Sequence, residues 1–192
     1  MGIVSFATTP VLLARFFHVL CRIHNVRKTV EFFCNSPEET EAIARAIAGI
    51  LRSGDVVSLE GELGSGKTFF TRAVAKALGY AERVTSPTFV LEKRYPLPDN
   101  SRGLTLIAHY DLYRLDSYAE LADIGFEDLP EGAVALVEWG DRFLTELPPE
   151  VIRVIFTITD ATSRRVRIEC DEERARELTK QQAPGVGVTP ER

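Results

Sequence analysis

The segment Gly61–Thr68 carries residues whose types and spacing suit phosphate chemistry. It reads Gly-Glu-Leu-Gly-Ser-Gly-Lys-Thr and matches the phosphate-loop pattern G-x-x-x-x-G-K-[ST] at every fixed position. Glycines let the backbone direct N–H groups at phosphate oxygens, Lys67 can reach the β- and γ-phosphates, and the Thr68 hydroxyl can ligate Mg²⁺. The pattern predicts a site for ATP and Mg²⁺; the alternative is a glycine-rich turn that binds nothing. The predicted nucleotide contacts here are Gly61, Gly64, Ser65, Gly66, Lys67, Thr68 and Phe69.

A carboxylate closes the apolar run Ala133–Glu138, which has five apolar residues followed by Glu138. Such a run is typical of a central parallel strand, and parallel strands bring their carboxyl ends to the sheet edge where nucleotides bind. We therefore expect Thr68 and Glu138 to hold Mg²⁺ together, with Glu138 acting directly or through a water molecule. The alternative is a surface glutamate that happens to stand at a strand end.

A second carboxylate, Asp111, ends the strand-like segment Leu104–Asp111 in the same manner. If both carboxylates converge on the nucleotide, one can serve the metal ion and the other can orient or deprotonate the attacking water. Asp111 and Lys67 are accordingly the predicted catalytic residues. The alternative for Asp111 is a structural role, as a cap of the following turn or as an ion pair with Arg114.

The segments on either side of the phosphate loop have the pattern of a strand and a helix. Asp55–Glu60 is rich in apolar and β-branched residues, and Thr68–Leu78 has helical character and stops at Gly79. Upstream, Val30–Cys34 reads as a strand and is followed by a helix with Ser36 as its N-cap. The order strand, helix, strand, phosphate loop, helix predicts an α/β protein with the three-layer P-loop NTPase fold.

Two further segment pairs have the alternation and turn signals of β-hairpins. Phe89–Tyr95 and Leu104–Asp111 are separated by a turn-rich connector, and Val151–Thr159 is joined to Arg164–Cys170 by a short polar turn. We expect Glu172–Lys180 to form a closing helix. Hairpins within an otherwise alternating pattern predict a mixed, partly parallel sheet.

The chain length and composition predict one folded domain. A chain of 192 residues with 45% hydrophobic content supports one sizeable core. We place the P-loop ATPase domain at residues 30–180 and a disordered tail, rich in Pro and Gly, at residues 181–192. Residues 1–29 lack Asp and Glu and form an extension outside the core. For this extension we weigh an organelle transit peptide against an upstream-annotated start or a loosely attached segment.

The charge and cysteine content indicate the setting in which the protein acts. A net charge of −5 and no basic stripe argue against a chain that coats nucleic acid, so any RNA is expected to be held by a partner. No apolar stretch is long enough for a membrane span. Cys21, Cys34 and Cys170 are odd in number and lack zinc-site spacing, which suits reduced thiols in the cytoplasm.

Four ordered motifs resemble the small bacterial TsaE ATPases of tRNA threonylcarbamoyladenosine (t6A) synthesis. Besides Gly61–Thr68, they are Thr85-Ser86-Pro87-Thr88-Phe89, His109-Tyr110-Asp111-Leu112-Tyr113-Arg114-Leu115 and Val137-Glu138-Trp139. The resemblance covers about residues 30–169. It implies that the loop carrying Ser86 and Thr88 is a switch near the γ-phosphate, that Asp111 is important for activity, and that Glu138 helps to hold Mg²⁺.

The resemblance further implies an ATPase that is slow alone and is activated by TsaD-like and TsaB-like partners, with modification of adenine 37 of the tRNA taking place on the partner. Two other functions remain open from the residues. A small-molecule kinase uses the same loop, although we find no Arg-rich lid segment. A GTP-operated switch is the other, but the Asn-Lys-x-Asp guanine signature is missing.

Overall fold

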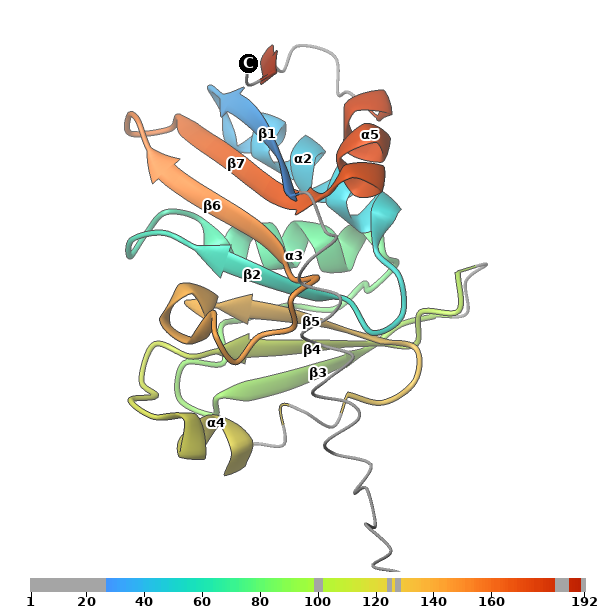
Figure 1. Cartoon of the computed structure of the whole chain (residues 1–192), viewed down its shortest axis with the longest axis vertical. Coiled ribbons are helices and arrows are strands. Elements are labelled where there is room, and N and C mark those ends of the chain that lie inside the picture. Colours follow the sequence, from blue (N-terminus) through green and yellow to red (C-terminus); the bar gives the residue numbers. More distant parts are fainter. Residues whose placement is uncertain (1–26, 99–101, 124–125, 127–128, 182–186, 191–192) are drawn as a thin grey trace, which may run out of the picture.

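The computed structural model describes residues 27–98, 102–123, 126, 129–181 and 187–190, and Figure 1 shows the arrangement of their helices and strands. The strands are β1 (Arg27–Cys34), β2 (Val56–Glu60), β3 (Glu92–Pro96), β4 (Leu106–Asp111), β5 (Ala133–Glu138), β6 (Ile152–Ile158), β7 (Arg164–Asp171) and β8 (Gly187–Pro190). The helices are α2 (Pro37–Ile50), α3 (Lys67–Ala77), α4 (Tyr118–Asp123), the 3₁₀ turn η1 (Gly140–Phe143) and α5 (Glu172–Lys180).

All of these strands join one mixed sheet in the order β3-β4-β5-β2-β6-β7-β1-β8. The central strands β4, β5, β2 and β6 run parallel, whereas β3 pairs antiparallel with β4 and the strands from β6 through β7 and β1 to β8 alternate in direction. Both predicted hairpins are confirmed. The strand that precedes the phosphate loop, β2, lies directly beside β5, as expected from their sequence patterns.

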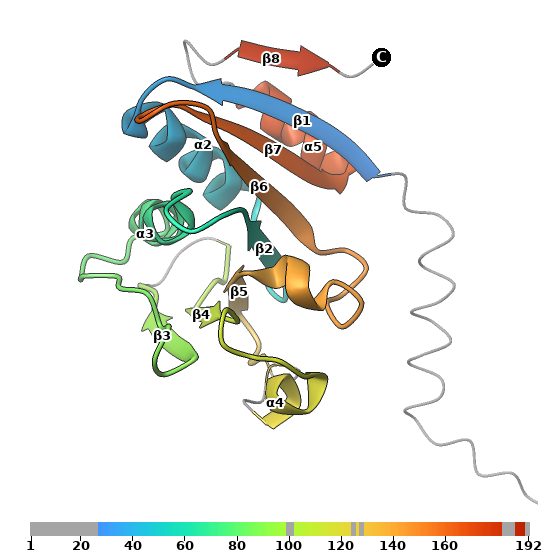
Figure 2. The same cartoon turned by 90° about the vertical axis from the view of Figure 1, so that its left-hand side faces the viewer.

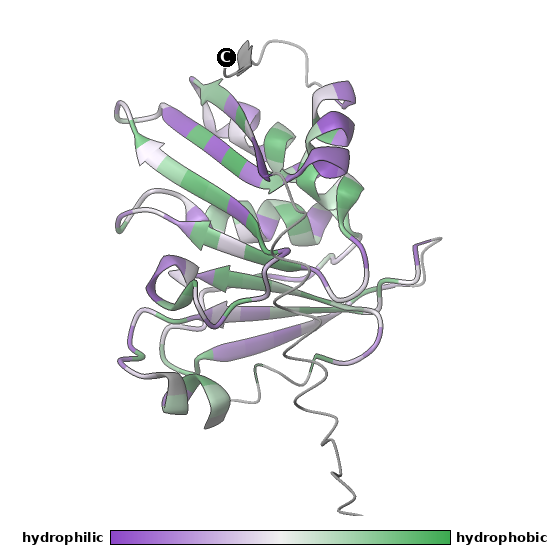
Figure 3. Cartoon of the chain, viewed as in Figure 1, coloured by the Kyte–Doolittle hydropathy of each residue, from purple (hydrophilic) through white to green (hydrophobic). Residues whose placement is uncertain are grey.

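Helices α2, α3 and α5 cover one face of the sheet, where α2 packs against both of the others (Figure 2). A second apolar cluster lies on the opposite face, under α4 and η1. The chain therefore has the predicted three-layer P-loop NTPase fold. On β7, the side chains of Arg165 and Arg167 are exposed on the face of the sheet opposite to α2, α3 and α5. Figure 3 shows hydrophilic residues alternating with hydrophobic ones along this strand.

Local signals explain where the helices begin. The Ser36 side chain accepts a hydrogen bond from the Glu39 N–H at 3.4 Å, and Pro37 occupies the first helical turn of α2, as predicted. Asp171 caps α5 in the same way through the N–H of Arg174. None of the described helices is long and apolar enough to cross a membrane.

The boundaries of the folded part differ from those predicted at both ends. Strand β1 begins at Arg27 rather than near Val30, because the Arg27 guanidinium donates to the carbonyls of Val151 and Glu169 at 2.7 and 2.9 Å and so ties this residue to the sheet. Residues 1–26 lie outside the described residues. Within the segment expected to be disordered, residues 181–192, the structure assigns Gly187–Pro190 to a short strand that pairs antiparallel with β1.

Phe70 anchors α3 in the core and gives a test of the packing. Its ring is fully buried and meets the Phe156 ring edge-on at 5.2 Å between centroids. We expect Phe70→Ala to lower the free energy of unfolding by about 3–5 kcal/mol, because it leaves a cavity behind the phosphate loop. Phe33 is 44% exposed, so Phe33→Ala should cost less than about 1 kcal/mol. Urea unfolding measures both; equal losses would contradict this packing.

Candidate nucleotide site

The phosphate loop connects the carboxyl end of β2 to the N-terminus of α3. Gly61 and Gly66 have φ of +133° and +112°, in the region that side-chain-bearing residues rarely adopt. A Cβ atom on Gly61 would also lie 2.5 Å from the Phe156 carbonyl oxygen. Both glycines are therefore required by the backbone path. The path leaves the first N–H groups of α3 facing the space above the sheet edge, where an anion is favoured.

Lys67 is buried at the start of α3. Its ammonium group donates to the carbonyls of Gly61 and Glu62 at 2.7 and 3.0 Å and lies 3.7 Å from the centroid of the Trp139 ring. Burial lowers the Lys67 pKa, while the carboxylates of Glu138 and Asp111 act in the opposite direction. A buried cation whose contacts include carbonyl dipoles and an aromatic face is well placed to exchange them for phosphate oxygens.

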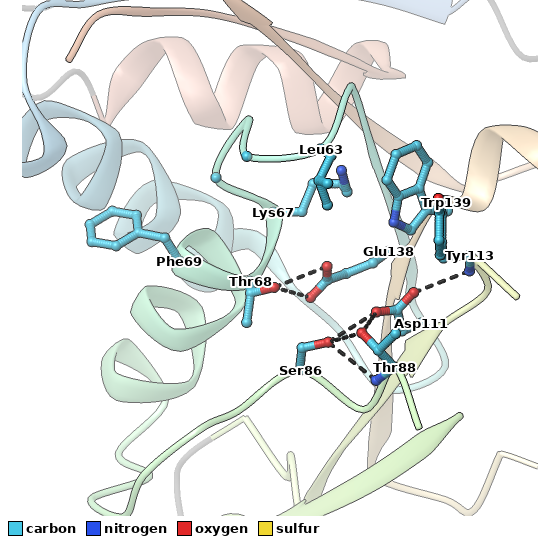
Figure 4. Close-up of a pocket in the computed structure, with 12 residues that line it drawn as sticks. Leu63, Lys67, Thr68, Phe69, Ser86, Thr88, Asp111, Tyr113, Glu138 and Trp139 are labelled. Carbon is cyan, nitrogen blue, oxygen red and sulfur yellow. Dashed lines mark hydrogen bonds between the residues drawn. The ribbon is translucent and has the colours of Figure 1, made fainter. Parts of the chain in front are cut away.

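Thr68 and Glu138 meet at the sheet edge, as Figure 4 shows. The Thr68 hydroxyl lies 2.8 and 3.0 Å from the two carboxylate oxygens of Glu138. The predicted convergence of these residues, which depends on β2 and β5 being neighbours, is confirmed. A hydroxyl and a carboxylate are oxygen ligands of the kind that Mg²⁺ prefers.

A buried histidine supports Glu138 from beneath. The Nε2 atom of His109 lies 2.8 Å from Glu138 Oε1, and its Nδ1 atom lies 3.4 Å from the Tyr95 hydroxyl, which itself donates to the Thr85 carbonyl. His109 is fully buried. These contacts give His109 a hydrogen-bonding role at the base of the site.

Asp111 binds the loop that carries Ser86 and Thr88. Its Oδ2 atom accepts hydrogen bonds from the Ser86 hydroxyl at 2.9 Å and from the Thr88 hydroxyl, and its Oδ1 atom accepts from the Tyr113 N–H at 3.1 Å (Figure 4). The last contact is the turn-capping role considered from the sequence. Within the part of the chain that the structure describes, Asp111 and Arg114 form no ion pair; the Arg114 guanidinium lies over the Phe89 ring instead.

The segment before β3 differs from its prediction. The apolar run from Phe89 suggested a strand to Tyr95, but β3 begins at Glu92. The N–H groups of Val90 and Leu91 both donate to the Pro87 carbonyl, which closes a turn, and Leu91 has a φ of +65°. Phe89 and Val90 are consequently exposed parts of the loop rather than strand residues.

A cavity of about 400 Å³ lies between the phosphate loop, the Ser86–Thr88 loop and the carboxyl ends of β4 and β5. Two predicted nucleotide contacts, Gly61 and Ser65, do not line it, and the Ser65 hydroxyl has no hydrogen-bond partner among the described residues. Figure 4 shows the Phe69 ring pointing away from the Thr68–Glu138 pair. The cavity is lined by Leu63, Gly64, Gly66, Lys67, Thr68, Phe69, Ser86, Thr88, Asp111, Tyr113, Glu138 and Trp139.

Two residues near this site were not assigned a role from the sequence. Trp139 was named only as part of a motif, yet the Lys67 ammonium group lies over its ring and its φ is +63°. Arg164 was noted only as the first residue of a strand, although it contacts the phosphate loop. Neither contact has a local signal, because each joins residues far apart in the sequence.

A glycine loop between a parallel strand and a helix, with Lys67 and Thr68 at the helix start, defines a protein of the P-loop NTPase fold class. The family model described as "Threonylcarbamoyl adenosine biosynthesis protein TsaE" matches residues 34–167. The chain therefore belongs to the TsaE family.

Relatives and a solved structure support this assignment. The tRNA threonylcarbamoyladenosine biosynthesis protein TsaE of Bacillus subtilis is 40% identical over 121 residues, which are 62% of this chain and 72% of that protein. The protein of the same name from Rickettsia felis is 38% identical over 131 residues, 68% of this chain and 74% of the relative. The crystal structure of Bacillus subtilis YdiB matches with a TM-score of 0.61 at 29% identity and covers 81% of this chain and 95% of that chain.

Proposed function

We propose that this protein binds and hydrolyses Mg²⁺–ATP in support of the t6A modification of tRNA, as part of a complex with TsaB-like and TsaD-like proteins. The observation that supports it most is the contact between Thr68 and Glu138, with the ammonium group of Lys67 buried beside them. These three side chains supply the oxygen ligands of a hard cation and a positive charge for phosphates at one edge of the sheet. A metal ion bound by protein side chains alone would need a different arrangement of ligands.

The donor set suits a metal ion that arrives with its nucleotide. The described residues contain no group of three His, Cys, Asp or Glu side chains that could hold a metal ion alone. Mg²⁺ commonly keeps water ligands and binds through one or two protein groups plus substrate phosphates. Thr68 and Glu138 would hold it here, and when bound it neutralises charge that develops on the phosphate oxygens.

The protein groups divide the remaining work. Lys67 exchanges the carbonyls of Gly61 and Glu62 for phosphate oxygens, while Glu138 is kept in place by His109. Asp111 holds the Ser86 and Thr88 hydroxyls at the wall of the cavity. Its Oδ2 atom becomes available to orient or deprotonate a water molecule only when those hydroxyls turn elsewhere, for example toward the γ-phosphate. Loop position and catalytic readiness are thereby coupled.

The surface around the cavity supports dependence on partners. Leu63, Phe89 and Tyr113 are exposed by 81%, 84% and 51%, and Leu63 and Tyr113 also line the cavity. Exposed apolar side chains beside an active site are typical of a docking surface. A net charge of −5 does not suit direct capture of tRNA, so tRNA is reached through the complex, which we place in the cytoplasm.

Reconstituted t6A modification with TsaB-like and TsaD-like partners tests this function. We expect Asp111→Ala to lower multiple-turnover modification about a hundredfold or more, the effect of losing a positioned acid–base group. Asp116→Ala is the matched control, since that carboxylate is 86% exposed and pairs with Arg142. If Asp111→Ala and the parent chain modified tRNA at equal rates, the ATPase role would fail, and a phosphoacceptor screen would then examine the kinase alternative.

A further inference from the structure

The β6–β7 hairpin lies against the phosphate loop and contacts it at both ends. No residue of the hairpin is among those that line the cavity. At the start of the loop, the Arg153 guanidinium binds both carboxylate oxygens of Glu60 at 2.7 Å, and the Phe156 carbonyl oxygen occupies the space next to Gly61. At the far end, Arg164 Nε donates to the Ser65 carbonyl at 3.0 Å and Nη2 lies 3.4 Å from the Gly64 carbonyl.

Among the described residues, the hydrogen-bond partners of Arg164 are all carbonyl groups. Its Nη1 atom donates to the carbonyls of Asp160 and Ser163 at 3.0 and 2.8 Å, so the guanidinium links the hairpin turn to the loop. No carboxylate of the described residues forms an ion pair with it, in contrast to Arg153, which pairs with Glu60 and Glu169. Within these contacts its charge is offset by peptide dipoles, and it adds positive potential near the anion site.

The contact with Ser65 also fixes the direction of a peptide group. A trans peptide is planar, and its C=O and N–H point in opposite directions. With the Ser65 carbonyl held by Arg164, the N–H of Gly66 in the same peptide group points away from the hairpin. Gly66 lines the cavity. The guanidinium thus sets the orientation of a loop N–H that a phosphate would use.

We propose that the β6–β7 hairpin braces the phosphate loop and that Arg164 is a positioning residue that sets the affinity of the site for phosphate groups. The proposal rests on the proposed function only in taking ATP as the ligand. It predicts two separable effects of removing the guanidinium: a more mobile loop without any ligand, and weaker binding of ATP.

Arg164→Met keeps most of the aliphatic stem and removes the donors, and Arg165→Met is the matched control. Arg165 is the next residue of β7 and lies on the solvent-exposed face, where its Nε atom is 3.8 Å from Glu31 Oε1. In the full ligand-free chain, we expect hydrogen exchange of the peptide spanning residues 61–67 to accelerate about tenfold in Arg164→Met and to stay unchanged in Arg165→Met, because a charge-assisted hydrogen bond is lost.

Calorimetric titration with Mg²⁺–ATP supplies the second measurement. We expect Arg164→Met to raise the Kd for ATP about tenfold, Arg165→Met to leave it unchanged, and Arg164→Lys to recover part of the loss, since an ammonium keeps the charge but not the fork. Unchanged loop exchange in Arg164→Met, or an ATP affinity within about twofold of a parent chain that binds ATP, would overturn the brace. A parent chain that fails to bind ATP, with loop exchange still faster in Arg164→Met, would overturn the proposed function and leave the brace standing.

Discussion

Mg²⁺–ATP binding is expected to fall at least about a hundredfold in Lys67→Ala, since two charge-assisted hydrogen bonds to phosphates contribute this much or more. In the structure this ammonium group contacts the carbonyls of Gly61 and Glu62 and the face of Trp139. These partners lie in the loop and at the end of β5, so the side chain is directed along the path that a phosphate would occupy. Calorimetry with the full chain measures the loss.

Lys76→Ala is the control for this variant. Lys76 stands on the same helix, α3, but its side chain is 74% exposed and pairs with Glu41 on the surface. The control should bind ATP as the parent chain does, which separates the effect of the phosphate contact from that of changing any lysine of the helix. Unchanged Mg²⁺–ATP affinity in Lys67→Ala would remove the loop from the nucleotide site.

The second large effect is expected from Glu138→Gln, which removes a charge while preserving shape. The carboxylate accepts the Thr68 hydroxyl and faces Nε2 of His109, so the amide can keep part of this arrangement. We expect the rate of ATP hydrolysis at a fixed Mg²⁺ concentration to fall by about tenfold to a hundredfold, which is the usual loss when a group that supports a bound metal is removed. Binding of ATP in the presence of a chelator should change little, because the loop N–H groups remain.

Two comparisons decide the role of Glu138. The Mg²⁺ concentration that gives half-maximal hydrolysis should rise in Glu138→Gln and stay constant in Glu173→Gln, whose carboxylate is 67% exposed and pairs with Arg52. Equal losses of ATP affinity with Mg²⁺ and with chelator would show that Glu138 serves the loop rather than the metal ion.

Local patterns predicted the parts of the site that lie on single elements. The phosphate-loop residues specify a strand, a turn and a helix within one short segment, and an apolar run closed by Glu138 specifies where a buried strand ends. Since parallel strands share one edge, the meeting of Thr68 and Glu138 follows from two such segments being neighbours. The closing helix has the bounds predicted for it, and in the structure the Asp171 side chain caps it by accepting from the N–H of Arg174.

The missed features depend on sheet order or on a turn. Arg164 reaches Ser65 across 99 positions of sequence because β6 pairs with β2 and β7 follows β6, an order that no local pattern encodes. Phe89 and Val90 have strand-like character, but hydrogen bonds to the Pro87 carbonyl turn the chain there. The hydrogen bonds of this local turn outweighed the β-propensity of these two residues.

The position of Trp139 has a practical consequence, because it is the only tryptophan of the chain. Its indole ring lies 3.7 Å from the ammonium group of Lys67 and stacks at a tilt on Tyr113, 5.0 Å between centroids. Because the chain has one tryptophan, the red-edge fluorescence of the unlabelled protein comes from this site alone. Indole emission also responds to nearby charge. A ligand that draws Lys67 away from the ring changes that signal at the moment of the movement, and stopped-flow mixing can follow it in real time.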